Sequence, residues 1–367
     1  MNLNVRNKFI FKIAGVFIIL YANHNNVKGQ PVSAAKTEQY IKKVMKTDTV
    51  PGIAVAVVKN GSLQYIKYSG YANLEQSIPV SERSVFQIAS VTKQFTAVCI
   101  MLLLKQGKIN LRNRVAAYLP DAPSSWQKIT INNLLTHTSG LKNYEDLPGF
   151  VEKAYLDSPH LVVAQSILHS LYQEKLNFSP NEKSEYCNSN YFVLGAIIEK
   201  VTGETYDKFL KENVLLPLEM DHTIINEMYN IVGGRVSGYT TVNNKMINAD
   251  RLGMDWFFAE GNIISTLTDM IKWLTAFEKH KLLSSQTIST MITGQPLTNG
   301  SPGEYGYGWI IDKNNPQIIF HSGHTPGFSA FVFHNAARKI SIILLMNNDN
   351  IKPDMLLKIS QDISENY

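Results

Sequence analysis

The stretch FQIASVTKQFTAVCIMLLLKQGK, residues 86–108, places a hydroxyl and an ammonium at the head of a long apolar run. The run predicts a helix that begins near Ser90 and ends at Gly107, because glycine commonly follows the last helical turn. Residues i and i+3 share one helix face, so the ammonium of Lys93 can reach the hydroxyl of Ser90. A lysine that apolar neighbours desolvate has a lowered pKa, and as the neutral amine it can accept the serine proton. The N–H groups of the first turn are also suitably placed to stabilise an oxyanion.

The Ser-x-x-Lys spacing alone is not specific, because the sequence also contains it at Ser33–Lys36, Ser125–Lys128 and Ser139–Lys142. Only Ser90 precedes a long, fully apolar run. A structural alternative exists for this pair as well: serine is a favoured N-cap residue, and Lys93 would then be a surface residue of the first turn. The position of the pair leaves both interpretations open.

The first residues are typical of a secretory signal peptide. Three basic residues precede an apolar core over residues 13–22, and small residues follow before Gln30. That core is about half of the roughly 20 apolar residues that a membrane-spanning helix needs. We therefore predict a signal peptide over residues 1–29, an exported protein that is periplasmic or secreted, and no stable membrane anchor once the leader is removed.

Composition narrows the classes of function further. The 367 residues carry a formal net charge of +5, and four of the positive charges lie in the predicted leader, which leaves about +1. This balance gives no indication of a nucleic-acid partner. The two cysteines, Cys99 and Cys187, are too few for a disulfide framework, and we expect both to be free thiols.

The order of the predicted elements indicates the fold class. Two β-rich runs meet at Asn60–Gly61, a strong hairpin signal. Helical patterns separated by Pro, Gly and Asn follow, and the last 60 residues return to strands before a closing helix that Pro353 can start. Strands at both ends predict an α+β fold, in which one antiparallel sheet is built from both chain ends, is flanked by helices and carries an inserted helical lobe.

These patterns also predict how the chain is divided. We expect a single domain over residues 30–367. Its sheet lobe would comprise about residues 30–108 and 300–367, and its helical lobe about residues 109–299. A cleft between the two lobes is the default place for a ligand.

Two further motifs accompany the Ser90 pair. The segment YCNSNY, residues 186–191, places Tyr186 and Asn188 in a loop just before a helix. The segment FHSGHTPGF puts His321 and Gly323 at the end of a strand. Tyr-x-Asn occurs twice elsewhere in the sequence, whereas His-x-Gly occurs once.

Together these motifs resemble those of the β-lactamase-related serine hydrolases. The ordered set SVTK, YCN and HSG, with LLTHTSGL, GNIISTLTDMIKWL and HTPGF, carries the resemblance from about residue 35 to 350. The family includes class C β-lactamases, D-alanyl-D-alanine carboxypeptidases, D-aminopeptidases and family VIII esterases. The resemblance implies a β-lactamase/transpeptidase-like fold and a penicillin-recognising serine hydrolase that forms an acyl-enzyme with a D-amino-acid peptide or small acyl ester. The alternatives are a class C-like β-lactamase and a catalytically silent protein that binds cell-wall peptides.

The resemblance also implies roles for the first two motifs. Ser90 would be the nucleophile and Lys93 its hydrogen-bonded activator. Tyr186 would be the general base for the serine and later the proton donor to the leaving group, with its pKa lowered by Lys93. Asn188 would orient Lys93 and bind the substrate amide.

The third motif would edge the cleft. His321 and Gly323 would lie on the strand beside the substrate, with His321 near Tyr186. The backbone N–H groups of Ser90 and His324 would form the oxyanion hole. The family resemblance implies no metal and no organic cofactor, and a small-molecule or peptide substrate of the kind derived from peptidoglycan.

The sequence departs from the family pattern at three positions. Class C β-lactamases carry lysine where this chain has His321, which favours peptidase or esterase action over efficient β-lactam hydrolysis. Cys187 stands where Ser or Ala is usual. Glu260 stands before Gly261, where a second glycine is common, and is expected to alter the wall of the cleft. His137 in LLTHTSGL is expected to belong to the scaffold.

Overall fold

The computed structural model of the chain describes residues 31–150, 164–227, 230–250 and 253–367, so the predicted leader lies outside the described residues. The helices of this part are α1 Pro31–Thr47, α2 Thr92–Lys105, α3 Ile131–Leu135, α5 Ala164–Tyr172, α6 Asn188–Thr202, α7 Tyr206–Leu210, α8 Phe258–Gly261, α9 Leu267–Glu278, α10 Ser285–Met291 and α11 Pro353–Glu365. The strands are β1 Gly52–Lys59, β2 Ser62–Asn73, β3 Ile78–Pro79, β4 Val85–Gln87, β5 Ile224–Ile225, β6 Tyr239–Val242, β7 Lys245–Asn248, β8 Ile263–Thr266, β9 Ile310–Ile311, β10 Ile318–Thr325, β11 Phe328–Asn335 and β12 Ile340–Met346.

The two ends of the chain meet in one antiparallel sheet of seven strands, in the order β3-β2-β1-β12-β11-β10-β9. The central pair joins the N-terminal β1 to the C-terminal β12, with Ile53 opposite Met346 and Lys59 opposite Ile340. The β1–β2 hairpin turns at Asn60 and Gly61, and both have positive φ, 51° and 64°, as a type I′ turn requires. The predicted sheet from both chain ends is therefore confirmed.

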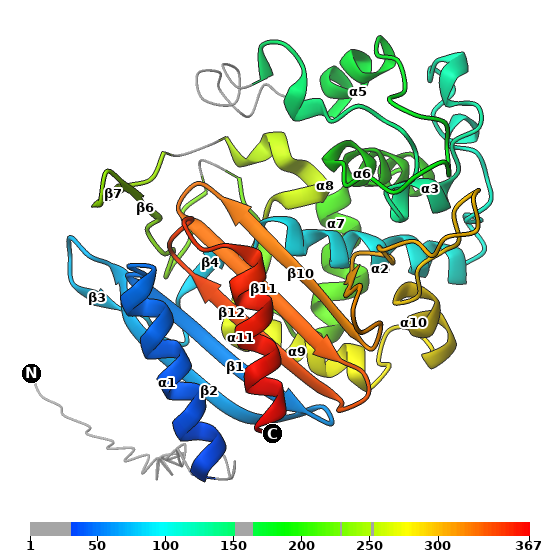
Figure 1. Ribbon diagram of the computed structural model, residues 1–367. Helices are drawn as coiled ribbons and strands as arrows, with labels where there is room; N and C mark the ends of the chain where they lie inside the picture. The colour runs from blue at the N-terminus through cyan, green and yellow to red at the C-terminus, as the bar shows by residue number, and fades with distance from the viewer. Residues whose placement is uncertain (1–30, 151–163, 228–229, 251–252) are drawn as a thin grey trace, which may run out of the picture.

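One face of the sheet is covered by the first and last helices. Figure 1 shows α1 and α11 side by side in front of the strands. Val44 of α1 and Ile363 of α11 pack in one buried cluster with Val55 of β1. The next residue along the strand, Ala54, belongs to the cluster on the opposite face. Successive side chains of a strand point to opposite faces, so both faces of β1 are buried, as its continuous apolar run predicts.

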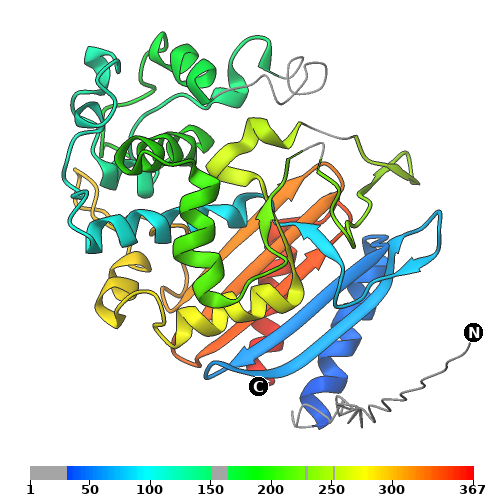
Figure 2. The same ribbon diagram turned by 180° about the vertical axis from the view of Figure 1, so that it is seen from behind.

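The opposite face is covered by the remaining helices. Figure 2 shows α9 lying across the strands, with α2 and the green helices of residues 188–210 next to it. Helix α2 is enclosed on all sides, because every residue from Thr92 to Leu103 is buried. A helix that is apolar all round requires such an environment. Phe95 of α2 stacks on Trp273 of α9 with ring centroids 4.0 Å apart.

Between residues 110 and 300, where the sequence predicts helices, the structure also contains short strands. Strands β5 and β8 of this region join β4, which precedes it, in a small sheet of order β4-β8-β5, and β6 pairs with β7. These strands are two to four residues long in that region, too short to show a period of two. The β4–β8 pair positions the site, because β4 ends two residues before Ala89. Within the described residues, no helix combines the length and the hydrophobicity that crossing a bilayer requires.

Candidate active site

Ser90 lies in a 3-10 turn, η1 Ala89–Val91, between strand β4 and helix α2. It is not the N-cap of α2: Val91 occupies that position, and no side chain caps the helix. Ala89 has a φ of +45°, a conformation that costs a non-glycine residue on the order of 1–3 kcal/mol and that often occurs at functional sites. The N-cap interpretation of Ser90 is therefore wrong, and the serine sits on a strained turn.

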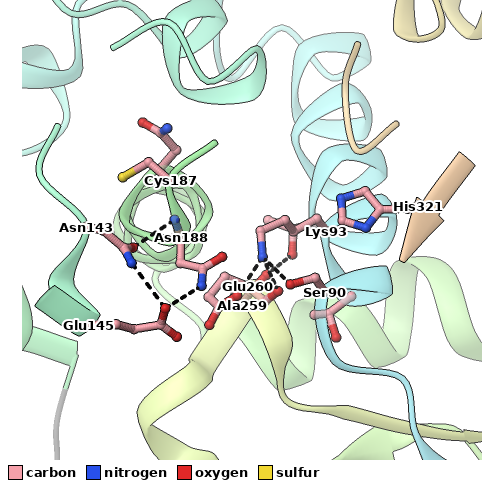
Figure 3. Close-up of polar contacts among 12 residues, drawn as sticks. Ser90, Lys93, Asn143, Glu145, Cys187, Asn188, Ala259, Glu260 and His321 are labelled. Carbon is pink, nitrogen blue, oxygen red and sulfur yellow. Dashed lines mark hydrogen bonds and ion pairs between the residues drawn. The ribbon is translucent and has the colours of Figure 1, made fainter. Parts of the chain in front are cut away.

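Lys93 is completely buried, which rules out a surface role. Its Nζ donates to Ser90 Oγ at 2.9 Å, to the carbonyl oxygen of Glu260 at 2.8 Å and to Oε2 of the same residue at 2.6 Å. Figure 3 shows the ammonium between the hydroxyl of Ser90 and the carboxylate of Glu260. The sequence did not predict the partnership with Glu260.

The other Ser-x-x-Lys pairs lack this arrangement. Lys36 donates to Asn366 and Lys142 pairs with Glu174, while Lys128 is exposed. The three-residue spacing therefore produces a buried serine–lysine contact only at Ser90, among the four pairs that the sequence contains.

The charge state of Lys93 differs from the expectation. Burial alone would lower its pKa, but Glu260 and Tyr186 together outweigh burial and raise the pKa above the ordinary lysine value. Burial also disfavours the charged form of Glu260, and for a carboxyl group this raises the pKa, here to about 7, although the Lys93 ammonium opposes the shift. The pair is thus ionised above neutral pH, and the expected neutral amine is not the resting form of Lys93.

Tyr186 lies where the motif predicts it. Its hydroxyl interacts with both Ser90 and Lys93, and Nζ of Lys93 is 5.1 Å from the centroid of its ring. The residue is 45% exposed because it also lines the cavity described below. Burial of the hydroxyl raises the pKa of Tyr186, and the lowering effect of Lys93 is smaller. The expectation of a lowered pKa is therefore wrong in its net direction.

Asn188 does not contact Lys93. Its Nδ2 donates to Glu145 at 2.9 Å, and its backbone N–H donates to Asn143 Oδ1 at 3.1 Å (Figure 3). Its amide oxygen is buried and has no hydrogen-bond partner. The expectation that Asn188 orients Lys93 is not met, because Glu260 already occupies that position next to the ammonium.

His321 projects from β10 beside Tyr186, with ring centroids 6.0 Å apart, as expected. Its Nδ1 lies 2.7 Å from the Ser322 carbonyl oxygen, and its Nε2 lies 2.7 Å from the Tyr305 hydroxyl. A carbonyl oxygen only accepts, so we assign the proton to Nδ1, and the neutral ring then accepts from Tyr305 at Nε2. Burial, together with Lys93, lowers the pKa of His321 to about 3. The ring is therefore neutral at physiological pH.

Gly323 permits a close approach of strand β10 to another part of the protein. A Cβ at this position would lie 2.1 Å from the carbonyl oxygen of Ile88 and 3.2 Å from the Cβ of Ala89. Strand β10 therefore packs directly against the turn that carries Ser90, and only glycine fits between them.

Substitution Gly323→Ala should consequently disturb both stability and the site. The overlapping atom is a backbone carbonyl that cannot rotate away, so we expect a loss of about 2 kcal/mol or more in the free energy of unfolding and a large drop in reactivity of Ser90. Urea denaturation measures the first effect. Gly233→Ala is the matched control, because a Cβ there meets no atom within 4 Å; equal stability of the two variants would contradict the packing argument.

His137 and Cys187 support the loop around Tyr186. Nδ1 of His137 accepts from the backbone N–H of Cys187 at 3.1 Å and lies 3.0 Å from Nδ2 of Asn190. Burial lowers the pKa of His137 well below its ordinary value, so the ring is a neutral acceptor within the scaffold. The thiol of Cys187 donates to the Leu141 carbonyl oxygen. Both cysteines, Cys99 and Cys187, are free and buried, which confirms that prediction.

Four of the seven predicted site residues line a cavity of about 390 Å³: Ser90, Tyr186, His321 and His324. Two larger hollows, of about 530 and 700 Å³, contain none of the predicted residues. Within the part of the chain that the structure describes, no group of three or more His, Cys, Asp or Glu side chains is arranged to hold a metal. The geometry fits attack of an activated serine hydroxyl on a carbonyl in this cavity.

The sequence did not identify several residues of the site. Tyr144 donates to Oε1 of Glu260 at 2.8 Å, Tyr305 contacts His321, and Glu145 accepts from Asn188. The one sequence signal for these residues was that Glu260 stands where the family commonly has glycine. Nothing in the sequence indicated that Glu260 faces Lys93, which is 167 positions away.

A buried Ser-Lys pair with a tyrosine at the same hydroxyl, on a sheet built from both chain ends, defines a serine hydrolase of the β-lactamase/transpeptidase fold. The family model described as Beta-lactamase matches residues 37–362. The chain therefore belongs to the Beta-lactamase family, and the predicted family and fold are confirmed.

Relatives and solved structures agree with this assignment. Penicillin-binding protein 4* of Bacillus subtilis (strain 168) is 30% identical over 315 residues, which cover 80% of this chain and 68% of that protein. Protein flp of Staphylococcus aureus (strain N315) is 27% identical over 342 residues, which cover 89% of this chain and 66% of that protein. The octameric penicillin-binding protein homologue from Pyrococcus abyssi is 26% identical, with a TM-score of 0.75 over 89% of this chain and 77% of that chain. The D-amino acid amidase from Ochrobactrum anthropi SV3 shares the fold at 21% identity, with a TM-score of 0.75 over 90% of this chain and 96% of its own.

Proposed function

We propose that this serine hydrolase is exported and cleaves an amide or ester of small acyl or D-amino-acid character through an acyl-enzyme at Ser90. One observation carries the proposal: the Ser90 hydroxyl is hydrogen-bonded to buried Lys93, interacts with Tyr186 and opens into the 390 Å³ cavity. A hydroxyl so placed has a proton acceptor on one side and room for a carbonyl on the other.

The reaction follows from these contacts. In the fraction of molecules with Tyr186 deprotonated, Oγ of Ser90 attacks the carbonyl carbon, its proton passes to the phenolate oxygen of Tyr186, and a tetrahedral oxyanion forms. Collapse breaks the bond to the leaving amine or alcohol, which takes the proton from Tyr186. Water then hydrolyses the acyl-enzyme by the same steps and releases the acid. Lys93 donates to Ser90 throughout, and the backbone N–H groups of Ser90 and His324 are our candidates for the oxyanion hole.

The charges at the cavity favour a substrate without a carboxylate beside the scissile bond. None of the described residues that line the cavity is lysine or arginine. His321 is neutral at physiological pH, and the ammonium of Lys93 is already paired with Glu260. Glu304 also lines the cavity, and its carboxylate pairs with Lys313 at 2.9 Å, so Lys313 adds no unpaired cation there. Neutral amides and esters therefore fit better than D-alanyl-D-alanine peptides or β-lactams, which carry a carboxylate.

Intact-mass spectrometry and turnover assays test the proposal. Purified protein and its Ser90→Ala variant are exposed to a short-chain p-nitrophenyl ester, a D-amino-acid amide, a D-alanyl-D-alanine peptide and benzylpenicillin. We expect turnover of the ester and the amide, and slower acylation by the two carboxylated compounds, all dependent on Ser90. If no compound reacts, or if the variant reacts equally, the acyl-enzyme proposal fails and a silent binding protein becomes the better description.

Export is a separate part of the proposal. It is supported by the basic and apolar pattern of residues 1–29. N-terminal sequencing of the protein recovered outside the cytoplasm should find a chain that begins near Gln30. Recovery of an intact chain from the cytoplasm alone would refute export and leave the proposed chemistry unaffected.

A further inference from the structure

Glu260 forms the most deeply buried ion pair among the described residues, inside the proposed catalytic machinery but without a role in it so far. The exposed fractions of the Lys93 and Glu260 side chains are 0% and 2%. Removing two charges from water is costly unless each is fully paired and hydrogen-bonded. A buried pair at this position therefore needs an explanation that packing alone does not provide.

The contacts of Lys93 favour its charged form. Nζ donates to three oxygen atoms, the Ser90 hydroxyl at 2.9 Å, the Glu260 carbonyl at 2.8 Å and the Glu260 carboxylate at 2.6 Å, and the Tyr186 hydroxyl also interacts with it. An ammonium has three N–H donors and no acceptor, so it satisfies all three contacts. A neutral amine could make the same contacts, with its lone pair accepting from the Ser90 hydroxyl, but it would leave the buried Glu260 carboxylate without a countercharge, which is costly.

The structure holds the carboxylate of Glu260 in place from the other side. Tyr144 donates its hydroxyl to Oε1 at 2.8 Å, so the two carboxylate oxygens have separate partners. Helix α8, which carries Glu260, packs closely on α6 at Gly195, where a Cβ would lie 2.4 Å from the Cβ of Ala259. Thr96 of α2 donates to the carbonyl of Ala259. The carboxylate is thus fixed relative to Lys93 by both neighbouring helices.

We infer that Glu260 is a positioning residue for the reaction: it holds Lys93 as an ammonium that donates to Ser90, so that Tyr186 and not Lys93 accepts the serine proton. The inference rests on the proposed function. It assigns to Glu260 a part that the sequence gave no reason to expect, since the expected effect of this residue was a change in the cleft wall.

Other titratable groups face the pair from each neighbouring element. They are Tyr144 and Glu145 from the turn at 144–146, His137 from the loop after α3, Tyr186, Cys187 and Tyr191 from the loop and start of α6, Tyr305 from the loop before β9, and His321 from β10. Of these, Glu145 is the other carboxylate, and it accepts hydrogen bonds from Asn143 and Asn188 rather than from Lys93. Glu260 is therefore the carboxylate that contacts the ammonium.

The consequence is a change in pH dependence. In Glu260→Gln, burial of Lys93 is no longer opposed by a carboxylate, so the pKa of Lys93 should fall and the ammonium should be lost at lower pH than in the wild type. The reactivity of Ser90 should then decline on the alkaline side at a pH lower by about one unit or more. A role in packing alone would reduce reactivity by the same factor at every pH.

The rate at which a fluorophosphonate labels Ser90, measured between about pH 6 and pH 10, tests the inference without knowledge of the substrate. We expect no alkaline decline in the wild type, a wild-type to Glu260→Gln ratio that grows with pH, and partial restoration in Glu260→Asp, which keeps a carboxylate. Glu174→Gln is the matched control, since Glu174 pairs with Lys142 at 3.0 Å outside the site, and its profile should match that of the wild type.

The outcomes separate the inference from the proposed function. No labelling of wild-type Ser90 would refute the proposed function. Labelling with an alkaline decline in the wild type, or with a Glu260→Gln profile parallel to the wild type, would overturn the inference and leave the function standing. If Glu260→Gln does not fold, Glu260→Asp replaces it in the experiment. The aspartate carboxylate is one methylene further from Nζ of Lys93, so the alkaline decline should move to lower pH by a smaller amount. An unchanged pH profile of Glu260→Asp would overturn the inference.

Discussion

Replacing Ser90 by alanine should reduce turnover of any accepted ester or amide by about 10⁴-fold or more, because the variant has no oxygen with which to form the acyl-enzyme. The residual rate would come from binding and oxyanion stabilisation alone. The fold should survive, since the lost hydroxyl interacts with two side chains of the site, Lys93 and Tyr186, and leaves the buried core unchanged. Steady-state kinetics on a p-nitrophenyl ester, with circular dichroism of both proteins, measures the two expectations.

Ser125→Ala is the matched control for that experiment. Ser125 has the same Ser-x-x-Lys spacing, with Lys128, but both residues are exposed. Turnover by Ser125→Ala should equal that of the wild type. A Ser90→Ala variant that retained a tenth or more of the wild-type rate while folded would rule out Ser90 as the nucleophile.

The sheet could be predicted from the sequence because its strands carry strong local signals. The turn at Asn60–Gly61 requires positive φ at both residues, and the sequence provides the two residue types that adopt it most readily. The strands at both chain ends are continuous apolar runs, and both of their faces are removed from water only when the sheet is packed between two layers of helices. The short strands β4, β5 and β8 could not be predicted, since two to four residues show no period and their pairing depends on contacts distant in sequence.

In the site, too, contacts between residues close in the sequence could be predicted, and contacts between distant residues could not. Ser90 and Lys93 were predicted because their contact depends on a three-residue spacing. The charge state of Lys93 was predicted in the wrong direction, because burial was visible in the apolar run but the compensating carboxylate of Glu260 was not. The expected contact of Asn188 with Lys93 was wrong for the same reason: the partner of Asn188, Glu145, is 43 positions away, in a segment without a motif.

Replacing Tyr186 by phenylalanine should lower kcat/KM by about 100-fold or more if its oxygen accepts the serine proton. Phenylalanine keeps the ring that lines the cavity and removes only the hydroxyl that interacts with Ser90 and Lys93. Because the pKa of Tyr186 is raised, the phenolate is a minor species at neutral pH, and its fraction grows about tenfold per pH unit below that pKa. The wild-type rate should therefore rise with pH between about pH 6 and pH 9, and the variant should lose this rise.

A control at a second tyrosine distinguishes the effect of losing a general base from the effect of losing a buried hydroxyl. Tyr307 donates to Asn132 Oδ1 at 2.7 Å and does not line the cavity, so Tyr307→Phe removes the same group without removing a proton acceptor. Its pH profile should follow that of the wild type. If Tyr186→Phe also kept the rise with pH, merely at a lower rate, another group would be the base. Lys93 would then be the first candidate, and the assignment of Glu260 as the residue that holds it charged would fail with it.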